Sequence, residues 1–137
     1  MVHLRDRTTN TFLRPVIQRI VDVFADADCN LGILAVDLDE AHARQQLGEL
    51  VDRVQLFLDP DGSSARALGV EGTPALVWVT PTPEVAEVAE GWHPVEWRHV
   101  LRAMAEKLRW SHPVLPLPGD PDPIAARPLW TVPARAA

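Results

Sequence analysis

One stretch near the middle of the chain limits the fold more than any other. Gly69 and Gly72 flank a turn, and Pro74 stands directly before the apolar run Ala75–Val79. A proline has no N–H to donate to a neighbouring strand, so Pro74 is expected at the first residue of a buried strand. The tight passage from a helix through this turn favours a cis Thr73–Pro74 bond, a form that about 5–6% of X–Pro bonds adopt. The stretch therefore predicts a helix end, a glycine turn and a buried strand.

The remaining apolar pattern predicts alternating helices and strands. Apolar residues recur at three- and four-residue spacing between Thr11 and Ala25, which is typical of a helix. They are Phe12, Leu13, Val16, Ile17, Ile20, Val21 and Phe24. The run Leu31–Leu38 is continuously apolar, as expected for a strand covered on both faces. The other predicted elements are a strand over Val2–Arg5, a helix over Glu40–Val51, a strand over Val54–Leu58, a short helix over Ser63–Leu68, an edge strand over Glu84–Glu90 and a helix beginning near Pro94. This order predicts a mixed sheet between helices, with parallel strands first and an antiparallel hairpin at one edge.

The composition changes at residue 111, which separates an expected domain, residues 1–110, from a tail, residues 111–137. Seven of the 13 prolines lie in that tail, so an extended or disordered chain is expected there. Its apolar residues indicate that part of it packs on a surface; they include Leu115, Leu117, Ile124, Leu129 and Trp130. Trp130 has two interpretations: an anchor in a protein–protein contact, or a side chain that packs back on its own domain.

The run Gly69–Leu76 resembles the cis-proline signature of the thioredoxin-like superfamily, and the order of elements over Val2–Leu108 is similar to that of the superfamily. The additional helix and strand within Asp39–Asp59, and the Asp59–Gly62 turn, resemble its TlpA and peroxiredoxin-like branches. The resemblance implies an α/β fold: a thioredoxin-like mixed sheet flanked by helices, with an inserted helix–strand and a C-terminal proline-rich tail.

The resemblance would imply dithiol chemistry, but the chain lacks the two cysteines that this chemistry needs. Members of the superfamily place Cys-x-x-Cys at the start of the first long helix, where the helix N-terminus lowers the pKa of the attacking thiol. Aligned by Pro15, that motif falls on Arg7–Asn10, or one residue later on Thr8–Thr11, and neither stretch contains a cysteine. The only cysteine, Cys29, follows the helix and is interpreted as a small, partly buried hydrophobe. A redox-sensing or intermolecular disulfide role is the alternative.

Charge and composition exclude several other classes. The formal net charge is −6, so a basic face that tracks nucleic-acid phosphates is not expected. There is no apolar run near 18 residues and no apolar secretory segment at the N-terminus, so we expect a cytoplasmic protein without a membrane span. The histidines and acids lack the spacing of known metal sites, and no cofactor is expected.

The surface that the resemblance leaves for function is a groove between the loop before the first long helix and the cis proline. The candidate binding residues are Arg7, Thr8, Thr9, Asn10, Thr73, Pro74 and Trp130. In the superfamily, the backbone just before the cis proline pairs with an extended segment, and main-chain hydrogen bonds need no thiol. We therefore expect a redox-inactive protein-binding, chaperone or accessory subunit, as in the thioredoxin-like accessory proteins of hydrogenase maturation. Its partner is expected to be another protein or a second copy of the chain.

Two alternatives follow from other residues. A thiol-dependent thioredoxin-like oxidoreductase would use Cys29 or a cysteine of a partner. A small-molecule site would instead hold an anion at the helix N-terminus through Arg7, Thr8 and Asn10.

Overall fold

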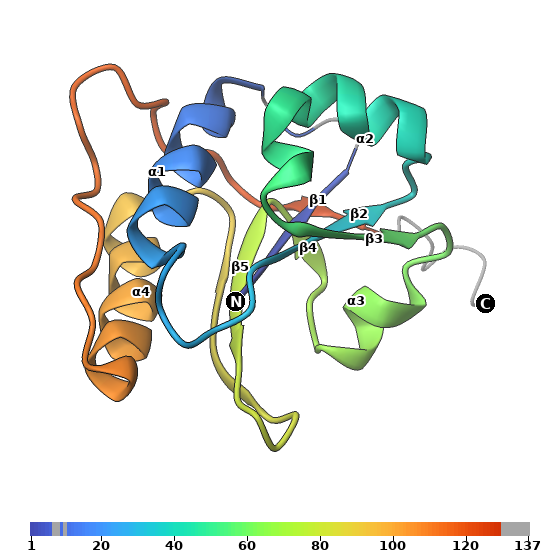
Figure 1. Cartoon of the computed structure of the whole chain (residues 1–137). Helices are drawn as coiled ribbons and strands as arrows, with labels where there is room; N and C mark the ends of the chain where they lie inside the picture. The colour runs from blue at the N-terminus through green and yellow to red at the C-terminus, as the bar shows by residue number, and fades with distance from the viewer. Residues whose placement is uncertain (7–8, 10, 130–137) are drawn as a thin grey trace.

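A five-stranded mixed sheet runs through the centre of the molecule, in the strand order β3-β2-β1-β5-β6 (Figure 1). This computed structural model describes residues 1–6, 9 and 11–129. The strands are β1 (Val2–Arg5), β2 (Gly32–Val36), β3 (Gln55–Asp59), β5 (Ala75–Val79) and β6 (Val85–Glu90). β1, β2 and β3 are parallel, whereas β5 lies antiparallel to β1 and β6 lies antiparallel to β5. The predicted mixed α/β sheet, with its antiparallel hairpin at one edge, is confirmed.

The strands form where the sequence predicts them. All five residues of β2 are buried, as the continuous apolar run indicates. The hairpin of β5 and β6 contains a register shift at Trp78 and Val79, in agreement with the imperfect alternation of β6. Two further short strands, β4 (Gly72–Thr73) and β7 (Arg127–Pro128), form a separate antiparallel pair.

Helices cover both faces of the sheet. They are α1 (Arg14–Phe24), α2 (Glu40–Leu47), α3 (Ser63–Ala67) and α4 (Pro94–Leu108), with one 3-10 turn at Thr11–Leu13 and another at Gly48–Asp52. Pro15 lies in the first turn of α1, where its missing N–H removes no helical hydrogen bond. Asp39 caps α2, because its carboxylate accepts a hydrogen bond from the His42 N–H at 2.8 Å. Gly69 follows α3 with φ +77°, a conformation that glycine adopts without strain.

Two apolar clusters lie on the two faces of the sheet, because successive side chains of a strand point in opposite directions. The larger contains the inner faces of α1 and α4 and includes Phe24, Ile33, Leu76 and Trp97. The smaller lies toward α3, and its members are Leu4, Leu34, Val36, Ala65, Val70, Ala75 and Val77. Burial of each such large side chain contributes about 1.5–3 kcal/mol. Phe12 is the exception among the predicted core residues of the first helix, since it is 74% exposed in the 3-10 turn.

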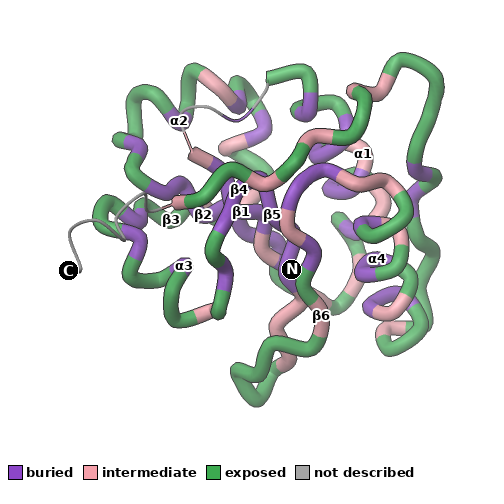
Figure 2. The backbone as a smooth tube through the Cα atoms, turned by 180° about the vertical axis from the view of Figure 1, so that it is seen from behind, coloured by how far each residue is buried: buried purple, intermediate pink, exposed green. Residues whose placement is uncertain are grey.

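The tail lies against the outside of the helical layer. From the end of α4 it passes along α4 and α1 and then returns to β4, where it forms β7 (Figure 1). Most of its described residues are exposed, whereas the central strands are buried (Figure 2). Leu115 is buried, and Ile124 and Leu129 are half-buried, so the predicted packing of these three apolar residues is confirmed. Leu117 is 40% exposed, and Trp130 lies outside the described residues.

Candidate functional site

The Thr73–Pro74 peptide bond is cis and joins β4 to β5 at the end of the sheet. Asp6, directly after β1, connects this bond to the loop before α1. The Thr73 hydroxyl donates to the Asp6 carboxylate at 3.0 Å, and the Asp6 N–H donates to the Thr9 hydroxyl at 3.0 Å. The structure therefore brings two predicted site residues, Thr9 and Thr73, to a shared partner beside Pro74. Arg7, Thr8, Asn10 and Trp130 lie outside the described residues.

A segment of the chain's own tail occupies the edge of β4 directly before Pro74. In the antiparallel pair of β4 with β7, Gly72 faces Pro128 and Thr73 faces Arg127. The pairing continues one residue further, because the Leu129 N–H donates to the Glu71 carbonyl at 2.9 Å. An extended segment is thus held by main-chain hydrogen bonds at the position where the sequence predicts a binding groove.

A second pair of main-chain hydrogen bonds holds the start of the same segment. The Trp92 N–H donates to the Ile124 carbonyl at 2.7 Å, and the Ile124 N–H donates to the Trp92 carbonyl at 2.9 Å. The indole N–H of Trp92 donates to the Pro121 carbonyl at 2.8 Å. Residues 121–129 are therefore anchored both after β6 and along β4.

Two glycines make room for this segment. A Cβ on Gly91 would lie 2.8 Å from the Ile124 carbonyl oxygen, and a Cβ on Gly72 would lie 2.9 Å from the Ala126 Cβ. Distances this short are not tolerated between non-bonded atoms of these kinds. Both positions must therefore lack a side chain for the tail to approach so closely.

The apolar side chains of the segment reach both faces of the sheet. Ile124 packs against the larger cluster, which lies between the sheet, α1 and α4. Leu129 packs against the smaller cluster, which lies toward α3. A cavity of about 470 Å³ remains beside the segment, and its lining residues are Thr9, Thr73, Pro74, Ile124, Ala125, Ala126, Arg127 and Pro128. We call this cavity and the adjoining edge of β4 the groove.

An ion pair fastens the tail outside the groove. The Arg19 guanidinium of α1 contacts both carboxylate oxygens of Asp120, at 2.7 and 2.9 Å. The Asp120 carboxylate also accepts from the Leu117 N–H, and its hydrogen bond with Arg19 lowers the pKa of Asp120 from its ordinary value. A bidentate contact of this kind is stronger and more directional than an ordinary hydrogen bond.

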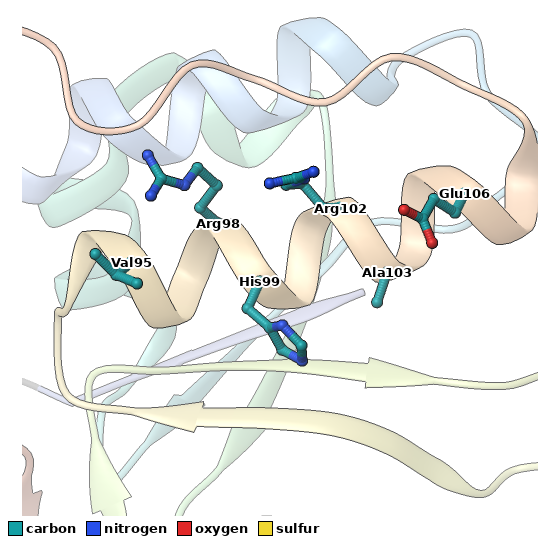
Figure 3. Close-up of a pocket in the computed structure, with 6 residues that line it drawn as sticks. All are labelled: Val95, Arg98, His99, Arg102, Ala103 and Glu106. Carbon is teal, nitrogen blue, oxygen red and sulfur yellow. The ribbon is translucent and has the colours of Figure 1, made fainter.

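The outer face of α4 supplies a further contact and a separate cavity. Arg98 donates to the Leu115 carbonyl at 3.1 Å, and Figure 3 shows Arg98 and Arg102 on the side of α4 toward the tail. His99 points toward the hairpin, where its Nε2 lies 3.5 Å from a Glu87 carboxylate oxygen. The cavity here has a volume of about 410 Å³ and is lined by Val95, Arg98, His99, Arg102, Ala103 and Glu106. It lies on the surface of one helix, and the described residues near Pro74 do not contribute to it.

Two polar side chains of β1 are fully buried near the groove. The Arg5 Nε donates to Gln46 at 2.9 Å, but the two terminal nitrogens of Arg5 have no hydrogen-bond partner among the described residues. Burial lowers the pKa of Arg5 to about 10; the negative charge of Asp6 opposes this change, and the positive charge of Arg14 adds to it. Because a pKa of about 10 is still well above 7, the guanidinium keeps its charge at neutral pH. The pKa of His3 is lowered to about 3, mainly by burial and secondly by the positive charge of Arg5. His3 is therefore neutral at pH 7.

Cys29 lies at the opposite end of the sheet from Pro74. It precedes β2 next to the start of β1, where the Gly32 N–H donates to the Met1 carbonyl at 2.9 Å. Burial raises the pKa of the Cys29 thiol, which disfavours the reactive thiolate. Among the described residues, no group of three or more His, Cys, Asp or Glu side chains is placed to hold a metal ion. The described helices also include none with the length and apolar character needed to cross a bilayer.

No protein-family model matches the sequence, and no curated protein matches it.

Two residues of this site, Asp6 and Gly91, are not among the candidate residues that the sequence indicates. Asp6 lies in the loop directly after β1, and this place puts its carboxylate within reach of Thr73. Gly91 lies between β6 and α4. Its signal is indirect, because a glycine at the end of a strand often marks the close approach of another segment.

Proposed function

We propose that this chain is a thioredoxin-like protein-binding domain that works without thiol chemistry. Its groove holds an extended segment of another protein, or of a second copy, along the edge of β4. One observation carries the proposal: the main chain directly before the cis Pro74 already pairs with an extended segment, from Arg127 to Leu129. Strand addition of this kind gives affinity through main-chain hydrogen bonds and selectivity through alternate side chains.

Other features support the thioredoxin-like assignment within the proposal. The order of helices and strands along the chain, with a cis proline before β5, agrees with the order of elements that the resemblance implies. The loop before α1 meets the cis proline through Thr9, Asp6 and Thr73, which carry no thiol. These three residues beside Pro74 can hold a bound segment through hydrogen bonds but cannot carry out dithiol exchange.

The test is selective loss of a bound partner from the full chain. A Cβ at Gly72 would lie 3.2 Å from the Arg127 carbonyl oxygen as well as 2.9 Å from the Ala126 Cβ, so Gly72→Ala obstructs any segment paired with β4. We expect this variant to lose partners that crosslink to residues 72–74 of the wild-type chain. Gly69→Ala is the matched control, because its Cβ meets nothing within 4 Å although φ is +77°. Equal retention of these partners by both variants would contradict the proposal.

The oxidoreductase alternative, which uses Cys29 or a cysteine of a partner, makes a different prediction. In its Cys29 form, Cys29→Ser abolishes a disulfide-reductase or peroxidase activity that the wild-type chain possesses. If the activity depends on a partner's cysteine, it requires that partner and survives Cys29→Ser. The raised pKa of the Cys29 thiol and the distance of Cys29 from Pro74 favour the binding function instead.

A further inference from the structure

The segment from Ile124 to Leu129 crosses the end of the sheet like a bound ligand. Its backbone pairs with Trp92 at one end and with Glu71, Gly72 and Thr73 at the other. Its two aliphatic side chains, five positions apart, pack against the two separate apolar clusters. A segment held only by chance would not engage both clusters and both strand edges.

The groove also limits the size of the side chain at position 126, which lies between the anchors Ile124 and Leu129. Ala126 is half-buried, and its Cβ lies directly over Gly72. Ala125 and Arg127, which alternate with it, are exposed. From Ile124 to Arg127 the alternation is that of an extended strand with one face on the protein, so the size of the side chain at position 126 is restricted whereas those at 125 and 127 are not. Pro128 is exposed, and Leu129, five positions after Ile124, packs on the opposite face.

The tail is fastened outside the groove by contacts that do not depend on it. The bidentate contact of Arg19 with Asp120 and the buried Leu115 hold the chain against α1 and α4 before it reaches Trp92. This tether keeps the segment near the groove at a high effective concentration, of the order of millimolar for a short link. Release of the tether would therefore lower the ability of the tail to compete with a segment supplied from outside.

We propose that residues 124–129 are a built-in ligand of the groove, and that its external ligand is an extended segment of the same pattern. That pattern is an aliphatic residue, a small residue two positions later and a second aliphatic residue five positions after the first. The inference rests on the proposed binding function and adds the class of segment and the competitor that controls access to it. The apparent affinity for an external segment is proportional to the fraction of molecules whose tail has left the groove.

The test uses a labelled peptide with the sequence of residues 123–129 and the full-length protein. Asp120→Ala removes the bidentate contact with Arg19 and the hydrogen bond from the Leu117 N–H, while Arg19 keeps its hydrogen bond to the Val114 carbonyl at 3.2 Å. The substitution changes no residue that lines the groove. Asp22→Ala is the matched control, because it removes an ion pair of α1, the helix that also carries Arg19, and the partner of Asp22 is Arg53 rather than a residue of the tail. We expect fluorescence anisotropy to show about tenfold tighter peptide binding to Asp120→Ala than to the wild type or to Asp22→Ala.

A peptide with Asp in place of Ile124, or Phe in place of Ala126, should bind at least about tenfold more weakly, because it loses one anchor or collides at Gly72.

The failures are distinguishable. Equal peptide affinity in the wild type and Asp120→Ala would overturn the competition by the tail while leaving groove binding intact. Equal affinity for the three peptides would overturn the proposed pattern. If the peptide binds none of the proteins, the binding function itself fails. Amide exchange gives a second measurement on the wild type: saturating peptide should speed exchange at the Ile124 and Leu129 amides of the tail, and unchanged exchange would contradict displacement.

Discussion

His3 and Arg5 project from the same face of β1, and both are buried although both can carry charge. The His3 Nδ1–H donates to the Ala75 carbonyl at 3.1 Å, and the His3 ring lies edge-on to Trp97. Among the described residues, Arg5 has one hydrogen-bond partner, Gln46, which accepts from its Nε. A buried charge without a full set of hydrogen bonds destabilises the folded state, so the charge of Arg5, and that of His3 once it is protonated, both oppose folding.

Replacement of Arg5 by an apolar residue should not destabilise the fold. Arg5→Met removes a charge whose two terminal nitrogens have no hydrogen-bond partner within residues 1–6, 9 and 11–129, and it keeps much of the side-chain volume. We expect the free energy of unfolding to stay the same or to rise by about 1 kcal/mol in urea denaturation. Arg53→Met, at the surface ion pair with Asp22, is the control and should change it by less than about 1 kcal/mol. A loss of more than about 2 kcal/mol in Arg5→Met would mean that the guanidinium has a stabilising partner in solution.

Stability should fall as the pH is lowered through the range in which His3 would ionise. The folded-state pKa of His3, about 3, lies below the ordinary histidine value of 6.5, so between these values the unfolded chain binds a proton that the folded chain does not. The stabilising effect of high pH is therefore complete above about 6.5 and is lost toward pH 3, with a slope of up to about 1.4 kcal/mol per pH unit. His3→Phe keeps an aromatic ring against Trp97 and removes the imidazole that takes up the proton. Urea denaturation at several pH values should give a smaller slope for this variant, and identical slopes would contradict the assignment.

Among the elements, β4 and β7 show how much the sequence could predict. The helix end, the turn at Gly69 and the strand over Ala75–Val79 follow from local patterns, and the structure confirms them. The partner of β4 does not follow from such patterns, because its pairing with β7 joins residues far apart in sequence and depends on tertiary packing. The proline content of the tail predicted extended chain correctly, but it carried no information about where that chain lies.

The position of Gly91 provides a test of the contact between tail and sheet. Gly91 has φ +81°, and a Cβ would lie 2.8 Å from the Ile124 carbonyl oxygen and 3.0 Å from the Ala126 nitrogen. Gly91→Ala should therefore release residues 124–129, seen as faster hydrogen exchange at the Ile124 and Leu129 amides. Gly69→Ala imposes a similar backbone strain of about 1–2 kcal/mol without meeting any atom within 4 Å, and it should leave that exchange unchanged. Similar effects of the two variants would show that the tail responds to general destabilisation only.

For the whole molecule, the tail joins the two apolar clusters that the sheet separates. The sequence predicted the mixed sheet between helices, because strand and helix periodicities are local properties. It brought Thr9 and Thr73 into one candidate site, and the structure connects them through Asp6. It could not predict that the edge of β4 in the groove would be paired with a segment of the same chain, since that depends on the path of the tail past α4 and α1.

The central claim is that the groove before Pro74 binds an extended segment by strand addition. The most direct measurement is NMR titration of the uniformly ¹⁵N-labelled full-length Asp120→Ala protein with the unlabelled peptide of residues 123–129. We predict that the largest amide shift changes occur at Glu71–Thr73 and at Gly91 and Trp92, the two edges that the tail pairs with or approaches. Changes confined to the outer face of α4, or no saturable change at those amides, would contradict the claim.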